Sequence, residues 1–468
     1  MNLYVGILCT FSPLKYGISK TGKTIYKCQP IDHSLPTIKI VYGGKLKGKI
    51  VVVFKLNSSQ LTESMPLGEI YHVIGVANPE NLVTTLLYHF RIVRKPLQSL
   101  TNIQEMESKI QRKDLTHFYI FSIDPKGCRD IDDAFSFERV TQEKTIVGVH
   151  IAQPVCFLTK EEILNRVESA FSTLYLGENE MIPLWSESVQ QKSSLLKNES
   201  RPVYSVFFTF EKNKCIGIEA YPTIIMNKYP THYDDLTNPR IVEFLEWTRE
   251  LLQQPIDTHE LVSHWMLETN QYIGSTHKVP YRVQAPTSNP NETIKCNDVN
   301  TEIQNVFCHY TMEKASYSLD TDIHASLERQ KYTHFTSPIR RIMDCLIHWQ
   351  ITYGESLEYD LQKINQLDQA TKKFHRMLEL NKKIDSIQDS QIKGYLYEKV
   401  KRGAWRLYFP ELGFIKVKIV DDRLEHLICP EKELEYVIGG CYPFSLNKKP
   451  GFLPMEKIIL TPLFKITE

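Results

Sequence analysis

The sequence predicts an α+β fold in which a large mixed α/β domain lies between two small β-barrels. Short apolar runs rich in β-branched residues, punctuated by Gly and Pro, fill residues 1–97. Strand patterns followed by long helical patterns fill residues 115–395, and short strand patterns return in residues 396–468. The polar stretch 98–114 is predicted to be a linker that contains a short helix.

The two barrels are predicted from short strands with turn residues between them. Residues 48–56 (GKIVVVFKL) and 68–76 (GEIYHVIGV) are β-rich runs, and Gly43, Gly44 and Pro66 mark turns beside them. Several short strands of this kind are typical of a small barrel. The strand patterns after residue 396 predict a second one.

The central region has the sequence signals of strands first and helices later. Apolar β-rich runs predict strands, and apolar residues at helical spacing predict helices. The predicted strands are 117–123, 135–140 and 145–152, and the predicted helices are 240–254, 259–273 and a long helical stretch from Pro338 to about Val400.

The composition is that of an ordinary folded protein with balanced charge. Lys and Arg number 56 and Asp and Glu 55, giving a net charge of +1, so any grip on nucleic acid must come from local basic patches. The ten cysteines include no Cys-x-x-Cys, which argues against a structural zinc site and favours reduced thiols. No leader is recognised, and no apolar run approaches the roughly 20 residues of a membrane helix. We expect a soluble, cytoplasmic monomer.

The first motif that carries chemistry is an acidic loop. Asp124 follows a predicted strand, and Asp130, Asp132 and Asp133 precede the next one. Four carboxylates within ten residues repel one another unless a cation or a shared proton relieves the charge. Hard divalent cations such as Mg²⁺ take oxygen ligands, so the loop fits a metal site. Taken alone, it fits a structural role as well.

The second motif is a pair of arginines at the start of a predicted helix. Thr336 or Ser337 is a suitable N-cap, and Pro338 suits the first helical position. Arg340 and Arg341 then lie where the helix dipole disfavours cations, which phosphate binding would explain. The alternative is an ion pair with Asp344, three or four residues on. We expect one arginine to be structural and the other functional.

Both segments resemble the ribonuclease II/ribonuclease R (RNB) family. Residues 123–134 read I-D-P-K-G-C-R-D-I-D-D-A and depart from the family pattern only at Cys128. Residues 332–348 read Y-T-H-F-T-S-P-I-R-R-I-M-D-C-L-I-H and depart at Ile342 and Cys345. Weaker matches lie between these two segments, in the same order as in the family.

The resemblance implies an RNB-type catalytic domain between OB-fold RNA-binding barrels, acting as a hydrolytic, processive 3′-to-5′ exoribonuclease. The family releases nucleoside 5′-monophosphates from single-stranded RNA by two-metal-type chemistry. Carried over by position, Asp124, Asp130 and Asp133 would ligate Mg²⁺, and Asp132 would complete the metal site and help to position the attacking water. Arg340 would hold the scissile phosphate. The implied RNA contacts are Tyr175 (a base), Tyr233 (the ribose) and Arg341.

Some positions depart from the family pattern or admit a structural role. Acidic residues of the family are replaced by Ser263 and His264, which affects the expected clamping of substrate more than the chemistry. His334 and His348 could touch phosphate, but we favour a structural role for both. The competing hypothesis for the whole chain is a catalytically weak RNA-binding member of the same fold.

Overall fold

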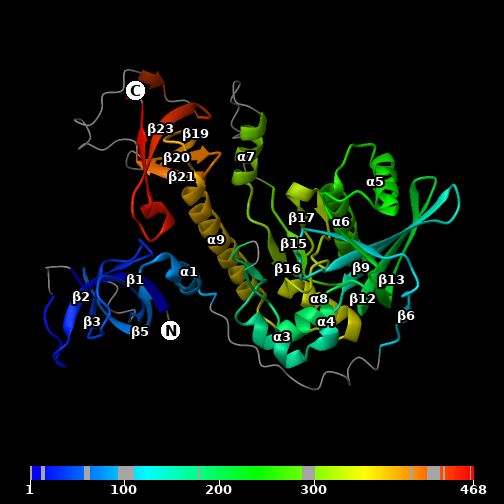
Figure 1. Ribbon diagram of the computed structural model, residues 1–468, viewed down its shortest axis with the longest axis horizontal. Coiled ribbons are helices and arrows are strands. Elements are labelled where there is room, and N and C mark those ends of the chain that lie inside the picture. Colours follow the sequence, from blue (N-terminus) through cyan, green and yellow to red (C-terminus); the bar gives the residue numbers. More distant parts are fainter. Residues whose placement is uncertain are drawn as a thin grey trace. The chain divides into compact units, whose positions relative to one another are not determined.

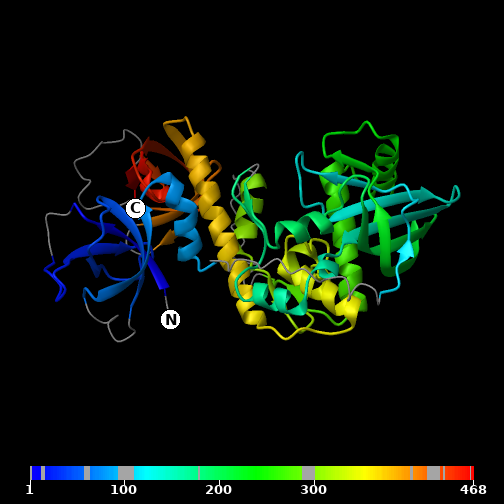
Figure 2. The same ribbon diagram turned by 60° about the horizontal axis from the view of Figure 1, so that its bottom comes forward.

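The computed structural model describes residues 3–11, 16–56, 64–92, 110–177, 180–286, 301–400, 404–418, 433–435, 438–463 and 465–467 (Figures 1 and 2). These residues divide into two compact units. Unit 1 comprises Met1–Val93, Thr287–Met312 and Lys372–Glu468, and unit 2 comprises Arg94–Pro286 and Glu313–Thr371. Most of the predicted linker, residues 98–109, lies outside the described residues.

Unit 1 contains the predicted N-terminal barrel. Five strands close in the order β1-β2-β3-β5-β4, with β1 paired to β4 antiparallel and β3 paired to β5 parallel. Alternate residues such as Ile38, Ile40 and Tyr42 point into its apolar core. The strands are β1 (Leu3–Cys9), β2 (Thr24–Pro30), β3 (Ile38–Tyr42), β4 (Lys49–Lys55) and β5 (Leu67–Val76), followed by η2 (Pro79–Asn81) and α1 (Leu82–His89).

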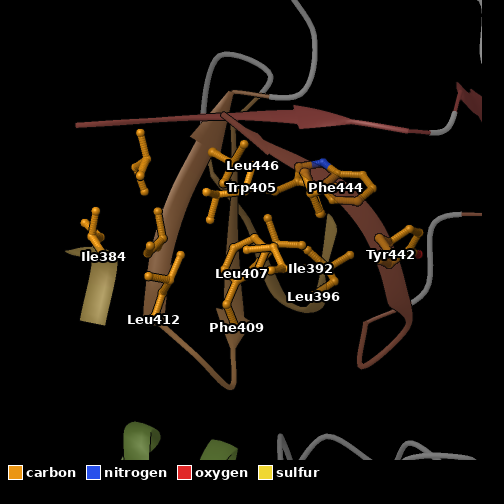
Figure 3. Close-up of a cluster of buried hydrophobic side chains, with 13 residues drawn as sticks. Ile384, Ile392, Leu396, Trp405, Leu407, Phe409, Leu412, Tyr442, Phe444 and Leu446 are labelled. Carbon is orange, nitrogen blue, oxygen red and sulfur yellow. The ribbon is translucent and has the colours of Figure 1, made fainter. Parts of the chain in front are cut away.

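The C-terminal strands of unit 1 form a second, open half-barrel of order β21-β20-β19-β23-β24. Figure 3 shows its core, in which Leu396, Trp405, Leu407 and Phe409 lie together. Its elements are β19 (Gln391–Val400), β20 (Ala404–Phe409), β21 (Gly413–Lys418), β23 (Cys441–Lys448), η6 (Pro454–Glu456) and β24 (Ile458–Pro462); β22 (Glu433–Glu435) pairs with β25 (Lys465–Thr467).

The prediction of helical structure up to Val400 was wrong at its C-terminal end. The last helix, α9 (Leu361–Ser386), stops before Asp389, and β19 begins at Gln391. The reason is a change of period, because alternate residues Ile392, Gly394 and Leu396 are buried. Residues two positions apart point to the same side of a strand but not of a helix. Only a strand can therefore turn these alternate positions toward the half-barrel core.

Unit 2 is built on a seven-stranded sheet of order β14-β7-β8-β9-β12-β13-β6. Its strands are mostly antiparallel, but the edge strand β14 runs parallel to β7 and the opposite edge strand β6 runs parallel to β13. The strands are β6 (Lys113–Asp114), β7 (Phe121–Asp124), β8 (Asp133–Arg139), β9 (Lys144–Ala152), β12 (Ser200–Glu211), β13 (Lys214–Met226) and β14 (Tyr229–His232).

Helices and short strand pairs complete unit 2. Aromatic side chains of α5 and α6, including Phe244 and Trp265, pack on Phe121, Phe135 and Phe208 of the sheet. The helices are η3 (Pro154–Phe157), α3 (Lys160–Val167), α4 (Glu187–Ser193), α5 (Pro239–Leu252), α6 (Thr258–Thr276), η5 (Ala325–Leu327), α8 (Ile342–Tyr353) and the first part of α9. The strand pairs are β10 (Leu174–Tyr175) with β11 (Met181–Ile182), β15 (Tyr281–Val283) with β16 (Ser316–Ser318), and β17 (Ile323–His324) with β18 (Arg329–Gln330).

The two predicted helices 240–254 and 259–273 are confirmed as α5 and α6. Each begins at a side-chain cap: Asn238 accepts from the Arg240 N–H, and Asp257 forms a capping box with Glu260. None of the helices in the described part of the chain is long and apolar enough to cross a membrane. The predicted α+β arrangement with a small barrel at each end is therefore confirmed.

Candidate active site

The acidic loop connects two neighbouring strands of the unit 2 sheet. Strand β7 ends at Asp124 and β8 begins at Asp133, and the two strands are antiparallel neighbours. Gly127 turns the loop at φ +81°, a conformation that glycine adopts without strain. The N–H of Ile131 donates to the Ser194 hydroxyl at 3.0 Å, which fixes the far side of the loop. Asp124 and Asp133 therefore lie at the same end of these two strands.

The carboxylates of this loop lie in a poorly solvated, negatively charged environment. The exposed fractions of Asp130, Asp132 and Asp133 are 7%, 2% and 9%. Burial raises the pKa of Asp124 to about 6, and the charge of Asp130 adds to the effect. Burial and the charges of Asp124 and Asp132 also raise the pKa of Asp133. The fold thus places Asp124 and Asp133 where their negative charge is costly.

The arginine motif meets this loop through Asp132. The Asp132 carboxylate accepts from the Arg340 Nε–H at 2.9 Å and from the backbone N–H of Ile339 at 2.8 Å. Arg340 lies 208 residues after Asp132 in the sequence, so the tertiary fold brings the two motifs together. The Asp132 side chain is 2% exposed and the Arg340 side chain 46% exposed. Arg340 is therefore anchored at one end and open to solvent at the other.

Arg341 faces a different partner from Arg340. Its guanidinium donates to Asp344 at 2.8 Å, and the Asp344 side chain is 0% exposed. The same Asp344 oxygen accepts the N–H of Ser337 at 2.8 Å. The expectation that one of the two arginines has a structural partner agrees with this arrangement, in which Arg341 neutralises a buried carboxylate.

The predicted start of the arginine helix was wrong. Helix α8 begins at Ile342, with Arg341 as its N-cap, and Ser337 does not cap it. The N–H groups of Arg340 and Arg341 donate to the carbonyl of Ser337, so this stretch is a turn that precedes the helix. Asp344 holds the turn by accepting the Ser337 N–H, a tertiary arrangement that propensity alone does not predict.

Tyr175 and Tyr233 approach the carboxylates from two directions. The Tyr175 hydroxyl donates to Asp130, and 43% of the residue is exposed. Tyr233 follows β14, whose register pairs His232 with Asp124. Burial, together with the charges of Asp133 and Asp124, raises the pKa of Tyr233 to about 12. The predicted site residues from the middle of the chain are thus brought together around one loop.

The two histidines of the arginine motif have structural partners. His348 is fully buried, stacks on Phe335 with ring centroids 3.7 Å apart, and makes a hydrogen bond of 2.9 Å with the Phe335 carbonyl. Burial lowers the pKa of His348 to about 3, so the ring is neutral. His334 makes a hydrogen bond of 2.6 Å with the Tyr317 hydroxyl. These contacts agree with the structural role favoured for both.

The oxygen donors of the acidic loop are of the kind that a divalent cation takes. One oxygen of Asp124, Oδ2, is buried without a hydrogen-bond partner, and the surrounding donors are hard carboxylate oxygens, as Mg²⁺ requires. Within the described residues, however, no three His, Cys, Asp or Glu side chains converge as a metal site. Asp130 is held by Tyr175 and Asp132 by Arg340. The donor chemistry of the loop fits a cation, although three carboxylates do not converge in this arrangement of the described side chains.

The sequence around this site matches a known protein family. The model of the RNB domain matches residues 112–243 and 240–353, which together cover more than half of the chain. The chain belongs to the RNB family. Ribonuclease R of Chlamydia muridarum is 26% identical over 326 residues, covering 53% of this chain and 47% of that protein. Ribonuclease R of Ureaplasma parvum is 22% identical over 434 residues, covering 70% and 59%. The chain spans about half the length of the first of these relatives.

Solved structures of RNB proteins share the fold. Apo ribonuclease R of Mycoplasma genitalium superposes with a TM-score of 0.75 at 18% identity, over 98% of this chain and 89% of that one. The same enzyme in complex with ribose-methylated single-stranded RNA gives 0.76. Yeast Ssd1, described as a pseudonuclease, gives 0.65 at 15% identity, over 89% and 65%. The fold is therefore common to nucleases and to a protein described as lacking nuclease activity.

Sequence reasoning did not find every residue that shapes this RNB site. It assigned the Tyr175 ring to a base but did not anticipate that the hydroxyl would bind Asp130. It also did not identify His259, which stacks on Tyr233 with ring centroids 3.6 Å apart and an interplanar angle of 13°. His259 is exposed in the first turn of α6, and nothing in the local sequence indicates its partner.

Proposed function

We propose that this RNB protein is a hydrolytic exoribonuclease that degrades single-stranded RNA processively from the 3′ end to nucleoside 5′-monophosphates. The observation that carries the proposal is the Asp132–Arg340 pair, which brings the acidic loop and the arginine motif into one site. An acidic loop alone or an arginine motif alone has structural explanations. Joined, they supply carboxylates for a metal ion and a cation for a phosphate, as phosphodiester hydrolysis requires.

Asp124, Asp130 and Asp133 would hold Mg²⁺. A bound metal ion of this kind neutralises charge on the phosphate and lowers the pKa of a water nucleophile. Asp124 is the best supported of these ligands, because its buried Oδ2 has no hydrogen-bond partner. Asp132 is assigned to positioning: its carboxylate holds Arg340 and would help to orient the attacking water.

Arg340 would bind the scissile phosphate. The half-exposed guanidinium is held at Nε by Asp132, which leaves other N–H groups to form paired hydrogen bonds with phosphate oxygens. A preorganised donor stabilises charge that develops during hydrolysis without a cost of reorganisation. We assign Arg341 a weaker RNA contact, since its guanidinium is already paired with Asp344.

Two tyrosines would contact the 3′-terminal nucleotides. Tyr175 has an exposed ring on which a base can stack without sequence preference. Tyr233 follows His232, which pairs in register with Asp124, and contact of Tyr233 with a 2′-hydroxyl would distinguish RNA from DNA. Single-stranded RNA is therefore the proposed substrate. We further propose that the protein acts as a monomer in the cytoplasm, as predicted from its sequence, and that each barrel is an RNA-binding domain.

A catalytically weak RNA-binding protein is the second candidate. Two observations favour it: the fold is shared with the pseudonuclease Ssd1, and three carboxylates do not converge among the described residues. The complete set of aspartates with Arg340 favours the enzyme, because an RNA-binding protein has no need to keep four buried carboxylates beside a phosphate-binding arginine.

The deciding experiment follows the products of a single-stranded RNA of about 30 nucleotides, labelled at its 5′ end in one reaction and uniformly in another, incubated with the protein and Mg²⁺. We expect nucleoside 5′-monophosphates and a short end product, with no long intermediates at limiting enzyme. Asp132→Asn and Arg340→Ala should each abolish the reaction. Asp320→Asn, the same chemical change at an exposed aspartate, should leave it intact.

Three results would each refute one part of the proposal. RNA that stays intact with Mg²⁺ and with Mn²⁺, while still bound by the protein, establishes the RNA-binding alternative. A DNA oligomer of the same sequence degraded at the same rate refutes the assignment of RNA as substrate. Activity that survives Asp132→Asn refutes the site.

A further inference from the structure

The outer face of the C-terminal half-barrel carries a row of aromatic side chains. The strand register pairs Tyr395 of β19 with Tyr408 of β20, and Tyr408 with Phe414 of β21. Their neighbours Leu396, Leu407 and Ile415 lie in the half-barrel core, as Figure 3 shows for the first two. Because successive side chains of a strand point to opposite faces, the three rings lie together on the outside.

A second row of side chains on the same face carries charge. Arg406 pairs in register with Lys416, and each lies two residues from a member of the aromatic row. Lys416 is exposed, and Arg406 is half-buried beside Glu398, with which it forms an ion pair. A surface that binds single-stranded nucleic acid combines aromatic rings, on which bases stack, with cations, which attract phosphates. This face of the half-barrel has both.

Helix α7 (Thr301–Thr311) covers this aromatic row. Phe307 is 3% exposed and packs against Tyr397, Tyr408 and Phe414, with ring centroids 5.3, 6.5 and 5.9 Å away. Tyr310 stacks on Phe414 with ring centroids 3.7 Å apart and an interplanar angle of 24°. By its contacts, α7 belongs to the same compact unit as the half-barrel.

A bulge in β19 supports the contact with α7. The register of β19 and β20 shifts between Leu396 and Glu398, which leaves Tyr397 as the unpaired residue. Bulges redirect a side chain out of the regular alternation. Here the redirected ring of Tyr397 lies 5.3 Å from Phe307 and 5.0 Å from Tyr310. The strand is thus shaped to receive the two rings of α7.

We propose that α7 is a built-in competitor for a base-stacking site on the half-barrel, so that single-stranded RNA must displace Phe307 and Tyr310 to occupy the aromatic row. The proposal shares with the proposed function only the assumption that RNA is the ligand. It adds the location of a binding face and a contact that restrains it. The rings of α7 occupy the place that nucleobases would take.

Displacement of α7 is physically reasonable. An isolated helix of 11 residues is marginal in water, so α7 depends on its packing for order. Phe307 and Tyr310 make five aromatic pairs with the half-barrel, each worth about 0.5–1.5 kcal/mol beyond the apolar area that it buries. Two or three bases stacked on the row contribute about 1–3 kcal/mol each, which is of the same order, and phosphates add attraction to the cations.

The test measures the affinity of the full chain for labelled single-stranded RNA by fluorescence anisotropy, in EDTA so that hydrolysis plays no part. Phe307→Ala combined with Tyr310→Ala removes the competing rings, and we expect the affinity to rise about tenfold, the effect of 1.4 kcal/mol. Adding Phe414→Ala, which removes part of the row, should cancel most of the rise. His309→Ala, at an exposed position of the same helix, should change nothing.

The direction of the change separates this role from a structural one. A helix that merely stabilises the half-barrel gives unchanged or weaker RNA binding when its rings are removed, and either result in a folded variant overturns the proposal. If the double variant fails to fold, Tyr310→Ala alone, at a 41% exposed residue, provides the same test with a smaller expected rise of about threefold. Absence of hydrolysis in the product assay refutes the proposed enzyme but leaves this outcome untouched.

Discussion

Asp132→Asn should abolish hydrolysis and yet make the metal-free protein more stable. Asp132 is 2% exposed, and its carboxylate has two protein partners, the Arg340 guanidinium and the Ile339 N–H. Burial raises the pKa of Asp132 to about 7 in spite of the opposing attraction of Arg340. The ionised side chain is therefore unfavourable in the fold, as expected where a protein sacrifices stability to keep a charge at its active site.

The size of the effect follows from that pKa. A change from 3.8 in the unfolded chain to about 7 in the fold corresponds to about 4 kcal/mol at 1.36 kcal/mol per pH unit. Asparagine carries no charge and avoids this cost, and its oxygen still accepts the Ile339 N–H. Its amide N–H groups face the Arg340 N–H, which removes about 1–2 kcal/mol of the gain. We expect Asp132→Asn to stabilise the fold by about 2 kcal/mol at pH 8.

The pH dependence supplies a second check. Because the folded-state pKa of Asp132 is raised, the wild type gains stability as the pH falls from about 7 toward 3.8, and the asparagine variant does not. The advantage of the variant should therefore fall by about 1.36 kcal/mol per pH unit below pH 7 and be lost by pH 5.

The assay is urea unfolding in EDTA, followed by circular dichroism, with Asp320→Asn as the control for the chemical change at an exposed position. Product analysis with Mg²⁺ on the same preparations gives the activity. A variant that is less stable than the wild type at pH 8 refutes the account of Asp132 as an unfavourable buried charge. A stabilised variant that remains fully active refutes the catalytic assignment.

Three further predictions rest on other parts of the molecule. Arg341→Ala leaves the fully buried Asp344 carboxylate unpaired and should cost about 3 kcal/mol in the free energy of unfolding, with partial recovery in Arg341→Lys; a loss below about 0.5 kcal/mol in urea unfolding would contradict this. Burial lowers the pKa of His150 to about 3, so below pH 6.5 the unfolded chain binds a proton that the folded chain does not. Stability should fall by about 2 kcal/mol per such histidine at pH 5, and the difference between wild type and His150→Gln should diminish by this amount. RNA affinity in EDTA should decrease linearly with the logarithm of salt concentration, by about 0.7 logarithmic units of slope per phosphate contacted. A flat response would show that phosphates contribute little.

Much of the fold could be predicted because local pattern and tertiary environment agree. Helices α5 and α6 have apolar residues at helical spacing and side-chain caps, and both were placed within a few residues. Strand β3 of the barrel alternates between buried and half-buried residues, as a two-sided sheet requires. Prediction failed at the start of α8 and after α9. There, a buried carboxylate and the core of another sheet set the boundary.

The sequence by itself determined the family and the chemical types at the site. Four aspartates at this spacing and two adjacent arginines with their flanking residues limit the function to charged-ligand chemistry without knowledge of any contact. The tertiary structure decided which partner each arginine has. Arg340 and Arg341 are adjacent and identical in type, yet one meets Asp132 and remains half open to solvent while the other closes on Asp344. Likewise, only packing places the rings of α7 on the half-barrel. Sequence specifies which groups are present, but their burial, and the pairing of Arg340 with Asp132, depend on residues that are distant in the sequence.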